Sequence, residues 1–356
     1  MGTSINLLRV MITSLGGTRN PHVLACTLRF LRSVRLVLKA LSTINRGALM
    51  KGIIKLAHTI LCLLLFQASD IIVKLNHNTA RAEKKKIILQ QADKLQGGEK
   101  RSPTGRIEPV RSVSGNVVFT HENMLLTCNK ATEFLESGIV QLRGNIFMTD
   151  RKLEVYCDDA LYYPDTGIAE LENNVRGRRL ENNLITKSKR ALVNNPENQV
   201  KIYNDAIAWQ GEQQLSGDTI MVQLKEMNGN KNVESITVSG NAFFAAKDTL
   251  DLTKPLYNQL SGKTMFITLN EQEKVTGIIV DSQARSLYHG YDDTSSPSGV
   301  NYSSGNTIIM SFAEGKLNRI AVSGNVEGKQ YPNKLRGSPK INLPGFRLRY
   351  GEKPEF

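Results

Sequence analysis

The tetrapeptide VSGN occurs three times in this chain of 356 residues, at Val113–Asn116, Val238–Asn241 and Val322–Asn325. Related phrases lie between these copies, and the central residues of the first five aligned phrases are separated by 29 to 36 residues. A period of about 20–50 residues is typical of stacked, solenoid-like architectures. The aligned phrases are VSGNVVF from 113, LRGNIFM from 142, LENNVRG from 171, IYNDAIA from 202, VSGNAFF from 238 and VSGNVEG from 322.

Each copy of the phrase has the alternation of a β-strand. Successive side chains of a strand point to opposite faces, and one face of every copy is apolar while the other is polar. The glycine suits a bulge or a close bend, where the lack of Cβ matters. The repeated phrase therefore builds a surface and carries no chemistry. The apolar positions are Val117, Phe119, Leu142, Ile146, Met148, Leu171, Val175, Ile202, Ile236, Val238, Phe244, Val322 and Val326.

The chain after Val110 reads as an all-β domain. Short alternating runs are punctuated by Gly, Asn, Asp and Pro at intervals of about 8–12 residues, which is typical of such domains. No stretch with helical spacing of apolar residues follows residue 110. We therefore predict an elongated, twisted stack of short strands over residues 110–330, with the segment Gly290–Asn306 as a long loop.

The positive charge is confined to the first part of the chain. Residues 1–110 hold 18 Lys/Arg and 5 Asp/Glu, whereas residues 111–356 hold 28 of each. Because a nucleic-acid-binding domain carries a basic face on its folded part, this balance argues against nucleic acid as a partner.

The sequence before residue 110 divides into three predicted segments. Residues 1–49 form a targeting extension or precede the true start, for which Met50 is our candidate. Residues 50–82 have the basic start, the apolar run and the Ala80–Ala82 site of a secretory signal, with an uncleaved membrane anchor as the alternative. Residues 83–109 are polar and aperiodic, which predicts a linker.

Catalytic and metal-binding patterns are absent from the sequence. His121 and His289 are 168 residues apart, without cysteine or carboxylate at ligand-like spacing, so we predict no metal site. The pair Asp158–Asp159 lies outside any Ca²⁺-loop pattern. No nucleophile motif or phosphate loop is present, and we predict neither a cofactor nor an enzyme.

Cys128 and Cys157 occupy equivalent places in successive repeats, in CNKA and CDDA. If those places lay on neighbouring strands about 4.8 Å apart, the two residues would be within disulfide range. The alternative interpretation is two small apolar core residues, and the sequence leaves both open.

The combined pattern resembles the OstA/LptA-like family. The residues that carry the resemblance are CNKATEFLESGIVQLRGNI followed by CDDALYYPDTGIAELENNV, in phase with the other copies over residues 110–330. The resemblance implies a periplasmic β-jellyroll of the lipopolysaccharide-transport bridge, with an apolar interior groove that holds lipid A acyl chains. The thirteen apolar positions given above would line that groove, and no catalysis is implied.

The resemblance also implies partners. Lipopolysaccharide would be the cargo, and other jellyroll proteins of the bridge, or further copies of this chain, would join by edge-strand pairing. Residues 331–356 would be a C-terminal tail or a docking strand. The location would be the periplasm, with anchoring in the inner membrane or association with the outer membrane as variants.

Two other functions compete with this one. A structural β-repeat protein would have the same apolar positions but a filled core. A carbohydrate-active β-helix enzyme would gather acidic and basic residues along one exposed groove.

Overall fold

The computed structural model describes residues 88–121, 124–227, 230–251, 253–292, 294–313 and 316–356. The predictions for residues 1–49 and 50–82 lie outside the described residues. Residues Lys85–Phe356 form one compact unit, which is described here by itself.

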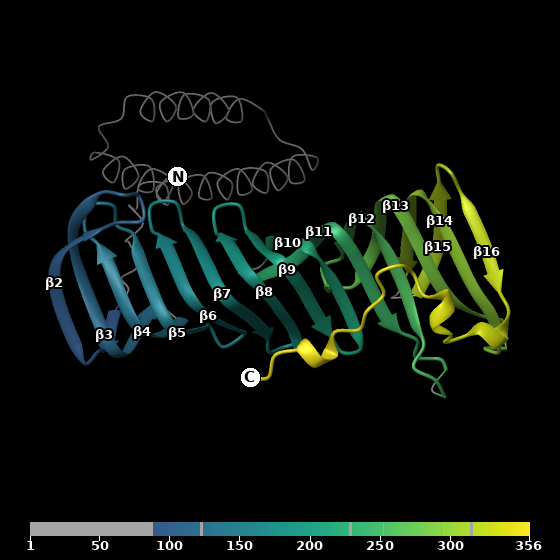
Figure 1. Ribbon diagram of the computed structural model, residues 1–356, viewed down its shortest axis with the longest axis horizontal. Coiled ribbons are helices and arrows are strands. Elements are labelled where there is room, and N and C mark those ends of the chain that lie inside the picture. Colours follow the sequence, from purple (N-terminus) through teal and green to yellow (C-terminus); the bar gives the residue numbers. More distant parts are fainter. Residues whose placement is uncertain (1–87, 122–123, 228–229, 252, 293, 314–315) are drawn as a thin grey trace, which may run out of the picture. The chain divides into compact units, whose positions relative to one another are not determined.

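The described residues form one open, antiparallel sheet of 16 strands, a twisted β-jellyroll, which confirms the predicted all-β class. From β3 to β14 each strand pairs with the strands that precede and follow it in the sequence, so the strands lie side by side along the long axis (Figure 1). The strands are β1 (Ile88–Gln91), β2 (Lys94–Arg101), β3 (Ile107–His121), β4 (Met124–Phe134), β5 (Val140–Thr149), β6 (Leu153–Tyr163), β7 (Ile168–Arg179), β8 (Leu184–Asn194), β9 (Gln199–Gln210), β10 (Gln213–Met227), β11 (Asn230–Lys247), β12 (Tyr257–Leu269), β13 (Val275–Tyr291), β14 (Pro297–Ala313), β15 (Lys316–Ser323) and β16 (Glu327–Tyr331).

The repeated phrase forms a bulge in the odd-numbered strands from β3 to β13, and its last copy bends the chain directly after β15. At its centre two consecutive residues have positive φ, as at Gly240 (73°) and Asn241 (51°), and the pairing register shifts there. Glycine and asparagine tolerate this left-handed backbone better than other residues. The pairs are Gly115–Asn116, Gly144–Asn145, Asn173–Asn174, Asn204–Asp205, Gly240–Asn241, Ser282–Gln283 and Gly324–Asn325.

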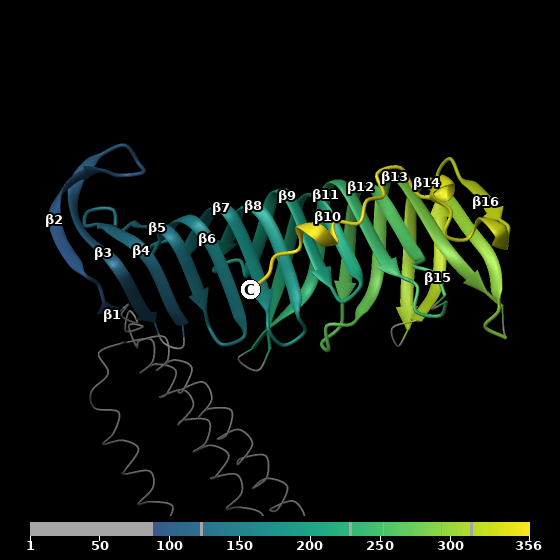
Figure 2. The same ribbon diagram turned by 60° about the horizontal axis from the view of Figure 1, so that its bottom comes forward.

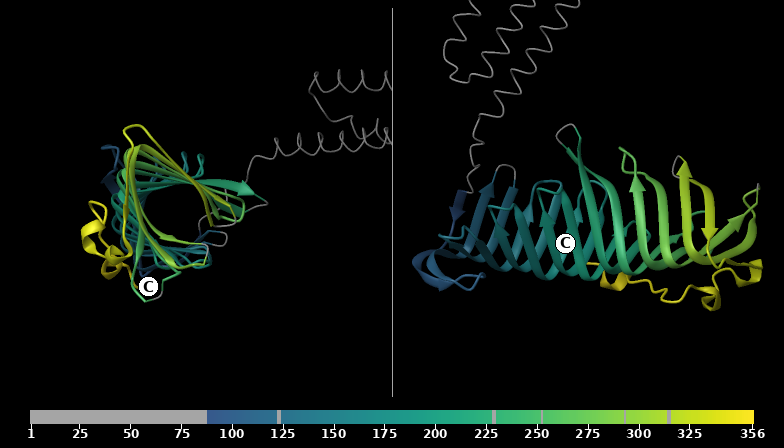
Figure 3. Two further views of the ribbon diagram at one scale, coloured as in Figure 1. Left: turned by 90° about the vertical axis from the view of Figure 1, so that its right-hand side faces the viewer. Right: turned by 90° about the horizontal axis from the view of Figure 1, so that it is seen from above.

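The bulges divide the sheet into two lobes. We call lobe 1 the part that contains residues 140–143 and 159–162, which pair with each other before the bulge of β5. Lobe 2 is the part that contains residues 146–149 and 154–157, which pair with each other after it. Seen along the length of the molecule, the strands form two walls that meet at an angle (Figure 3). The faces that the two walls turn toward each other carry the apolar positions of the repeats.

The asparagines of the bulges also bind the neighbouring strand. Asn116 Nδ2 donates to Asp93 Oδ2 over 3.0 Å, and Asn241 Nδ2 donates to Asp218 Oδ1 over 3.1 Å. Equivalent bonds join Asn145 to Asn129, Asn174 to Asp158 and Asn325 to Asn306. The phrase therefore fixes both the bend of its own strand and the position of the next one.

The predicted linker over residues 83–109 is wrong for its described part. β1 and β2 pair with the two ends of β3, so together they act as one edge strand that is broken near Asp93. Both strands are almost wholly exposed, and an edge strand with solvent on both sides has no reason to alternate apolar and polar residues.

The predicted long loop at residues 290–306 is also wrong. β13 continues to Tyr291 and β14 begins at Pro297, so a short turn joins two long strands that pair along their whole ends. Ser295 and Ser296 lie in this turn, whereas the later serine and glycine residues lie within β14, where Gly299 packs closely against Tyr331 of β16.

The C-terminal tail folds back over the outer face of lobe 2 (Figure 2). It contains three 3-10 turns, η1 (Asn333–Leu335), η2 (Pro339–Ile341) and η3 (Tyr350–Glu352), and no strand. Of the two alternatives given for residues 331–356, this arrangement is that of a tail, whose apolar side chains pack within the chain. Ile341 and Leu343 are buried against Phe243 and Leu287.

Candidate functional site

The candidate site is the apolar interior between the two lobes. One continuous cluster of buried residues extends from Val113 on β3 to Met310 on β14, and it consists of aliphatic side chains, methionine and cysteine. Of the thirteen predicted positions, seven are buried members of this cluster: Val117, Leu142, Ile146, Leu171, Val175, Ile202 and Val238. Five more are partly buried and pack against it: Phe119, Met148, Ile236, Phe244 and Val322.

Val326 is the predicted position that lies outside the cluster. It is 60% exposed and sits between β15 and β16, which form the last edge of the sheet. The equivalent Val117 and Ile146 are covered because their strands have neighbours on both sides, whereas in the described part of the chain β15 and β16 have a neighbour only on the side of β14.

Burial of the inner face falls with distance from the bulge. On β6 the inward positions are Cys157, which is 3% exposed, then Val155, which is half-buried, and then Leu153, which is 43% exposed. β4 shows the same order from Cys128 through Leu126 to Met124. Two walls that diverge from a bend fill the space near the bend by themselves, and they leave apolar surface uncovered toward the strand ends.

An ion pair joins the two lobes near the middle of the chain. Arg179 at the end of β7 in lobe 2 contacts Glu273, in the turn between β12 and β13 at the end of lobe 1, over 2.5 Å. Burial alone would lower the pKa of Arg179, but its bonds to Glu273 and Glu181 raise it overall. Glu273 also accepts a bond from the backbone N–H of Val233 over 2.8 Å. The pair thus links strands that are not neighbours in the sheet.

Comparison with known proteins gives one family match. Residues 84–205 match the model of the family described as OstA-like protein. These residues are therefore similar to OstA-like proteins. No curated protein matches the chain.

A solved structure also matches. It is the crystal structure of LptH from Pseudomonas aeruginosa, titled as the LptA homologous periplasmic component of the conserved lipopolysaccharide transport device. The match has 15% sequence identity and a TM-score of 0.32, and it covers 43% of this chain and 97% of that one.

The architecture of the matched part of the chain continues beyond residue 205. The bulges at Gly240–Asn241, Ser282–Gln283 and Gly324–Asn325 follow residue 205, and the apolar cluster passes through the strands that contain the first two. The interior is therefore one surface from β3 to β14 and not a series of separate cores.

Cys128 and Cys157, which both lie within the matched residues, are buried, free thiols. The assumption that they lie on neighbouring strands is wrong, because β5 separates β4 from β6, and two strand spacings amount to roughly 10 Å. That separation exceeds the Cα distance of about 7 Å beyond which a disulfide cannot form. Burial raises the pKa of Cys128 to about 11 and that of Cys157 to about 12, with Asp158 and Asp159 adding to the second shift.

A buried polar cluster near the C-terminal end of the sheet escaped the sequence analysis. Arg336 donates to the carbonyls of Gly290 and Gly299 over 3.0 and 3.1 Å and to Tyr291 Oη over 2.7 Å, and it lies 3.6 Å from Asp248. Its members come from β13, β14, the β11–β12 connection and the tail, so no local pattern could reveal them. The cluster fixes the start of the tail.

Among the described residues, no group of three or more His, Cys, Asp or Glu side chains could hold a metal ion. The same part of the chain has no helix of the length and hydropathy needed to cross a membrane. His289, singled out in the sequence, is buried beside the polar cluster, and burial followed by the charge of Arg336 lowers its pKa.

Proposed function

We propose that this chain is a periplasmic lipopolysaccharide-transport protein whose interior binds the acyl chains of lipid A. The observation that carries the proposal is the continuous apolar inner face, which is buried near the bulges and uncovered toward the strand ends. The OstA-like family match supports the same class of function.

The energetics of this site suit an acyl chain. Each methylene that leaves water contributes about 0.8 kcal/mol, so ten methylenes against the inner face contribute roughly 8 kcal/mol. The saccharide remains in water outside the strand ends. Because the lining repeats at every strand, about 4.8 Å apart, neighbouring positions along the interior are similar in affinity, and a chain moves between them without a large barrier.

The two edges of the sheet would join this protein to its partners. β1 and β2 pair only with β3, and β15 and β16 pair only with β14, so the outer edge of each is without a strand partner in the described part of the chain. Such edges template additional strands. We propose that other jellyroll domains of the transport bridge, or further copies of this chain, add to them, and that the bridge lies in the periplasm.

A structural protein with a filled core is the second candidate. It is favoured by the residues next to the bulges, since Ile146, Val238 and Met265 are fully covered without any ligand. The two functions make different predictions for the half-buried residues of the interior. These residues contact lipid in a transport protein, whereas they need no ligand in a structural protein.

Photo-crosslinking tests the proposal at one such residue. Met148 on β5 points into the interior and is half-buried, whereas the next residue, Thr149, points to the outer face. A photo-reactive amino acid is placed at either position of the full chain, which is then exposed to lipopolysaccharide. We expect abundant adducts from position 148 and few from 149.

Folding is verified for both variants by circular dichroism. Absence of lipid adducts at position 148 in a folded protein would establish the filled core and end the transport proposal. Equal labelling at both positions would show non-specific adsorption and would count against an interior site as well.

A further inference from the structure

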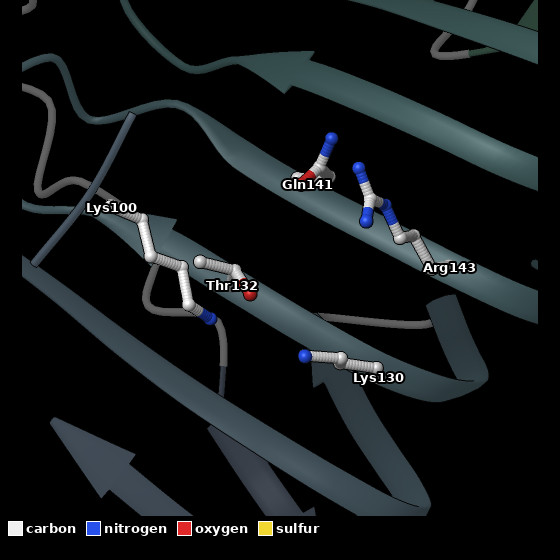
Figure 4. A pocket seen from close by; sticks show the side chains of 5 residues that line it. All are labelled: Lys100, Lys130, Thr132, Gln141 and Arg143. Carbon is white, nitrogen blue, oxygen red and sulfur yellow. The ribbon is translucent and has the colours of Figure 1, made fainter. Parts of the chain in front are cut away.

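A small basic hollow lies on the outer face of lobe 1, near the N-terminal edge of the sheet (Figure 4). It has a volume of about 120 Å³. Its lining residues are Lys100, Lys130, Thr132, Gln141 and Arg143. No acidic residue lines it.

The fold brings these side chains together from three strands. On β4 and β5, Lys130 pairs with Arg143, and Thr132 pairs with Gln141. These residues point away from the interior, to which the alternate positions Ala131 and Leu142 belong.

Lys100 reaches the hollow from β2, which curls over this end of the sheet with β3 (Figure 2). Its Nζ donates to Ser112 Oγ over 2.9 Å, and Ser112 Oγ lies 3.1 Å from Thr132 Oγ1. These bonds hold the ammonium group of Lys100 at the wall of the hollow.

The nearby carboxylates are used elsewhere. Asp159 lies opposite Arg143 on β6, but its Oδ2 accepts a bond from Asn173 over 2.9 Å. Glu133 forms an ion pair with Arg111, and Glu108 accepts bonds from Ser137. On the other side of Arg143, the adjoining hollow contains Asp159, Glu170 and Glu172, of which Glu172 is paired with Arg190. The three cations of the basic hollow repel one another, and no carboxylate lines that hollow to neutralise them. Burial, and then the charges of Lys130 and Arg143, lower the pKa of Lys100.

We propose that this hollow binds the phosphate group of a phosphomonoester. The guanidinium group of Arg143 presents paired donors that match phosphate oxygens, and the two ammonium groups act as point charges. Gln141 and Thr132 add neutral donors from the floor. Donors arranged on three sides suit a tetrahedral anion better than a flat carboxylate, and the cavity has room for a single such group. The hollow is on the opposite face of the sheet from the proposed acyl-binding interior, so phosphate binding there does not depend on the proposed function.

Isothermal titration of the full chain with inorganic phosphate tests the site. We expect saturable binding to the wild-type protein. The double variant K130Q/R143Q should bind at least tenfold more weakly, since it loses two charge-assisted contacts. Lys263 provides the control, because it is an exposed lysine on β12, opposite the bulge of β11, and lines no part of the hollow. K263Q should bind phosphate like the wild type.

Two results would overturn the site. One is the absence of saturable phosphate binding to the wild-type chain. The other is a loss of affinity in K263Q equal to that in K130Q/R143Q, which would show that phosphate responds only to net charge. Because Lys130 and Arg143 are exposed, we expect K130Q/R143Q to fold like the wild type, and circular dichroism checks that it does.

A second arm identifies the source of the phosphate. The same proteins are floated with phosphatidylcholine vesicles that contain or lack phosphatidic acid, whose headgroup is a phosphomonoester. Recruitment that requires phosphatidic acid and is lost in K130Q/R143Q supports the site and assigns it to a lipid headgroup. Phosphate binding without such recruitment supports the site and assigns it to a small phosphorylated solute.

Discussion

Gly240 shows how a single residue allows the bulge of its strand to form. Its φ of 73° lies in the left-handed region, and a Cβ added to it would lie 2.1 Å from Asp218 Oδ2. The next residue, Asn241, binds the same carboxylate. Gly115 repeats the arrangement, since a Cβ there would lie 2.2 Å from Asp93 Oδ2. The glycine thus allows the close approach, and the asparagine makes it favourable.

Gly240→Ala should destabilise the protein by about 2–5 kcal/mol. Left-handed backbone costs a non-glycine residue roughly 1–2 kcal/mol, and the clash with Asp218 adds about 1–3 kcal/mol for overpacking. Urea unfolding measures the change. Gly98→Ala is the control, because a Cβ at Gly98 meets nothing within 4 Å, and it should change stability by less than about 0.5 kcal/mol. Equal stabilities for the two variants would contradict the role given to Gly240.

The C-terminal tail is the element whose structure was hardest to predict from the sequence. Gln214 in β10 donates to the carbonyl of Arg347 over 2.9 Å and accepts from the N–H of Arg349 over 2.7 Å, which imitates a backbone pairing. Gln259 in β12 accepts a bond from the N–H of Leu343 over 2.9 Å and donates to the side chain of Asn342 over 2.7 Å. Each bond joins residues far apart in the sequence, and the tail has no period of its own. A sequence pattern therefore could not distinguish a tail that packs against its own chain from one that docks on a partner.

The end of the tail should loosen in acid. Arg349 donates to Glu352 and forms a two-pronged contact with Asp205, and its bonds hold the pKa of Glu352 at about 2. Because this pKa is below the ordinary value of 4.5, the stabilisation from Glu352 is fully present above pH 4.5 and is lost as the pH falls toward 2. Trp209, the one tryptophan of the chain, is buried beside Tyr350 and reports the change by fluorescence.

Glu352→Gln separates this effect from general acid unfolding. At pH 7 the variant should already show a red-shifted Trp209 emission, and its emission should depend less on pH between 4.5 and 2. An unshifted spectrum at pH 7, together with the wild-type pH profile, would mean that Glu352 does not hold the tail.

At the scale of the whole molecule, the repeats predicted the architecture because they combine two distinctive residues with a fixed interval. The bulge at Ser282–Gln283 was missed, since neither residue is typical of left-handed backbone. The edge strands β1 and β2 were missed because they bury nothing. Likewise, Lys100 and Arg143 lie 43 positions apart, and only the curl of β2 brings them to one hollow.

The open edges make a last prediction about the assembled protein. Exposed apolar side chains accompany both edges, with Leu95 on β2 69% exposed and Val326 beside β16 60% exposed. A row of unpaired backbone groups flanked by such side chains favours addition of another strand, and a charge at the edge opposes it. We therefore expect the full chain to associate end to end with rising concentration, and Leu95→Asp or Val326→Asp to weaken that association at least tenfold in sedimentation equilibrium.

Leu250→Asp supplies the comparison, because Leu250 is equally exposed but lies in the connection between β11 and β12, away from both edges. If that substitution dissolved the assemblies as well, general hydrophobic adhesion and not strand pairing would explain them. If only one of the two edge substitutions acted, the contact would join like edges instead of running head to tail. A head-to-tail contact needs both edges, and it alone would extend the apolar interior from one copy into the next.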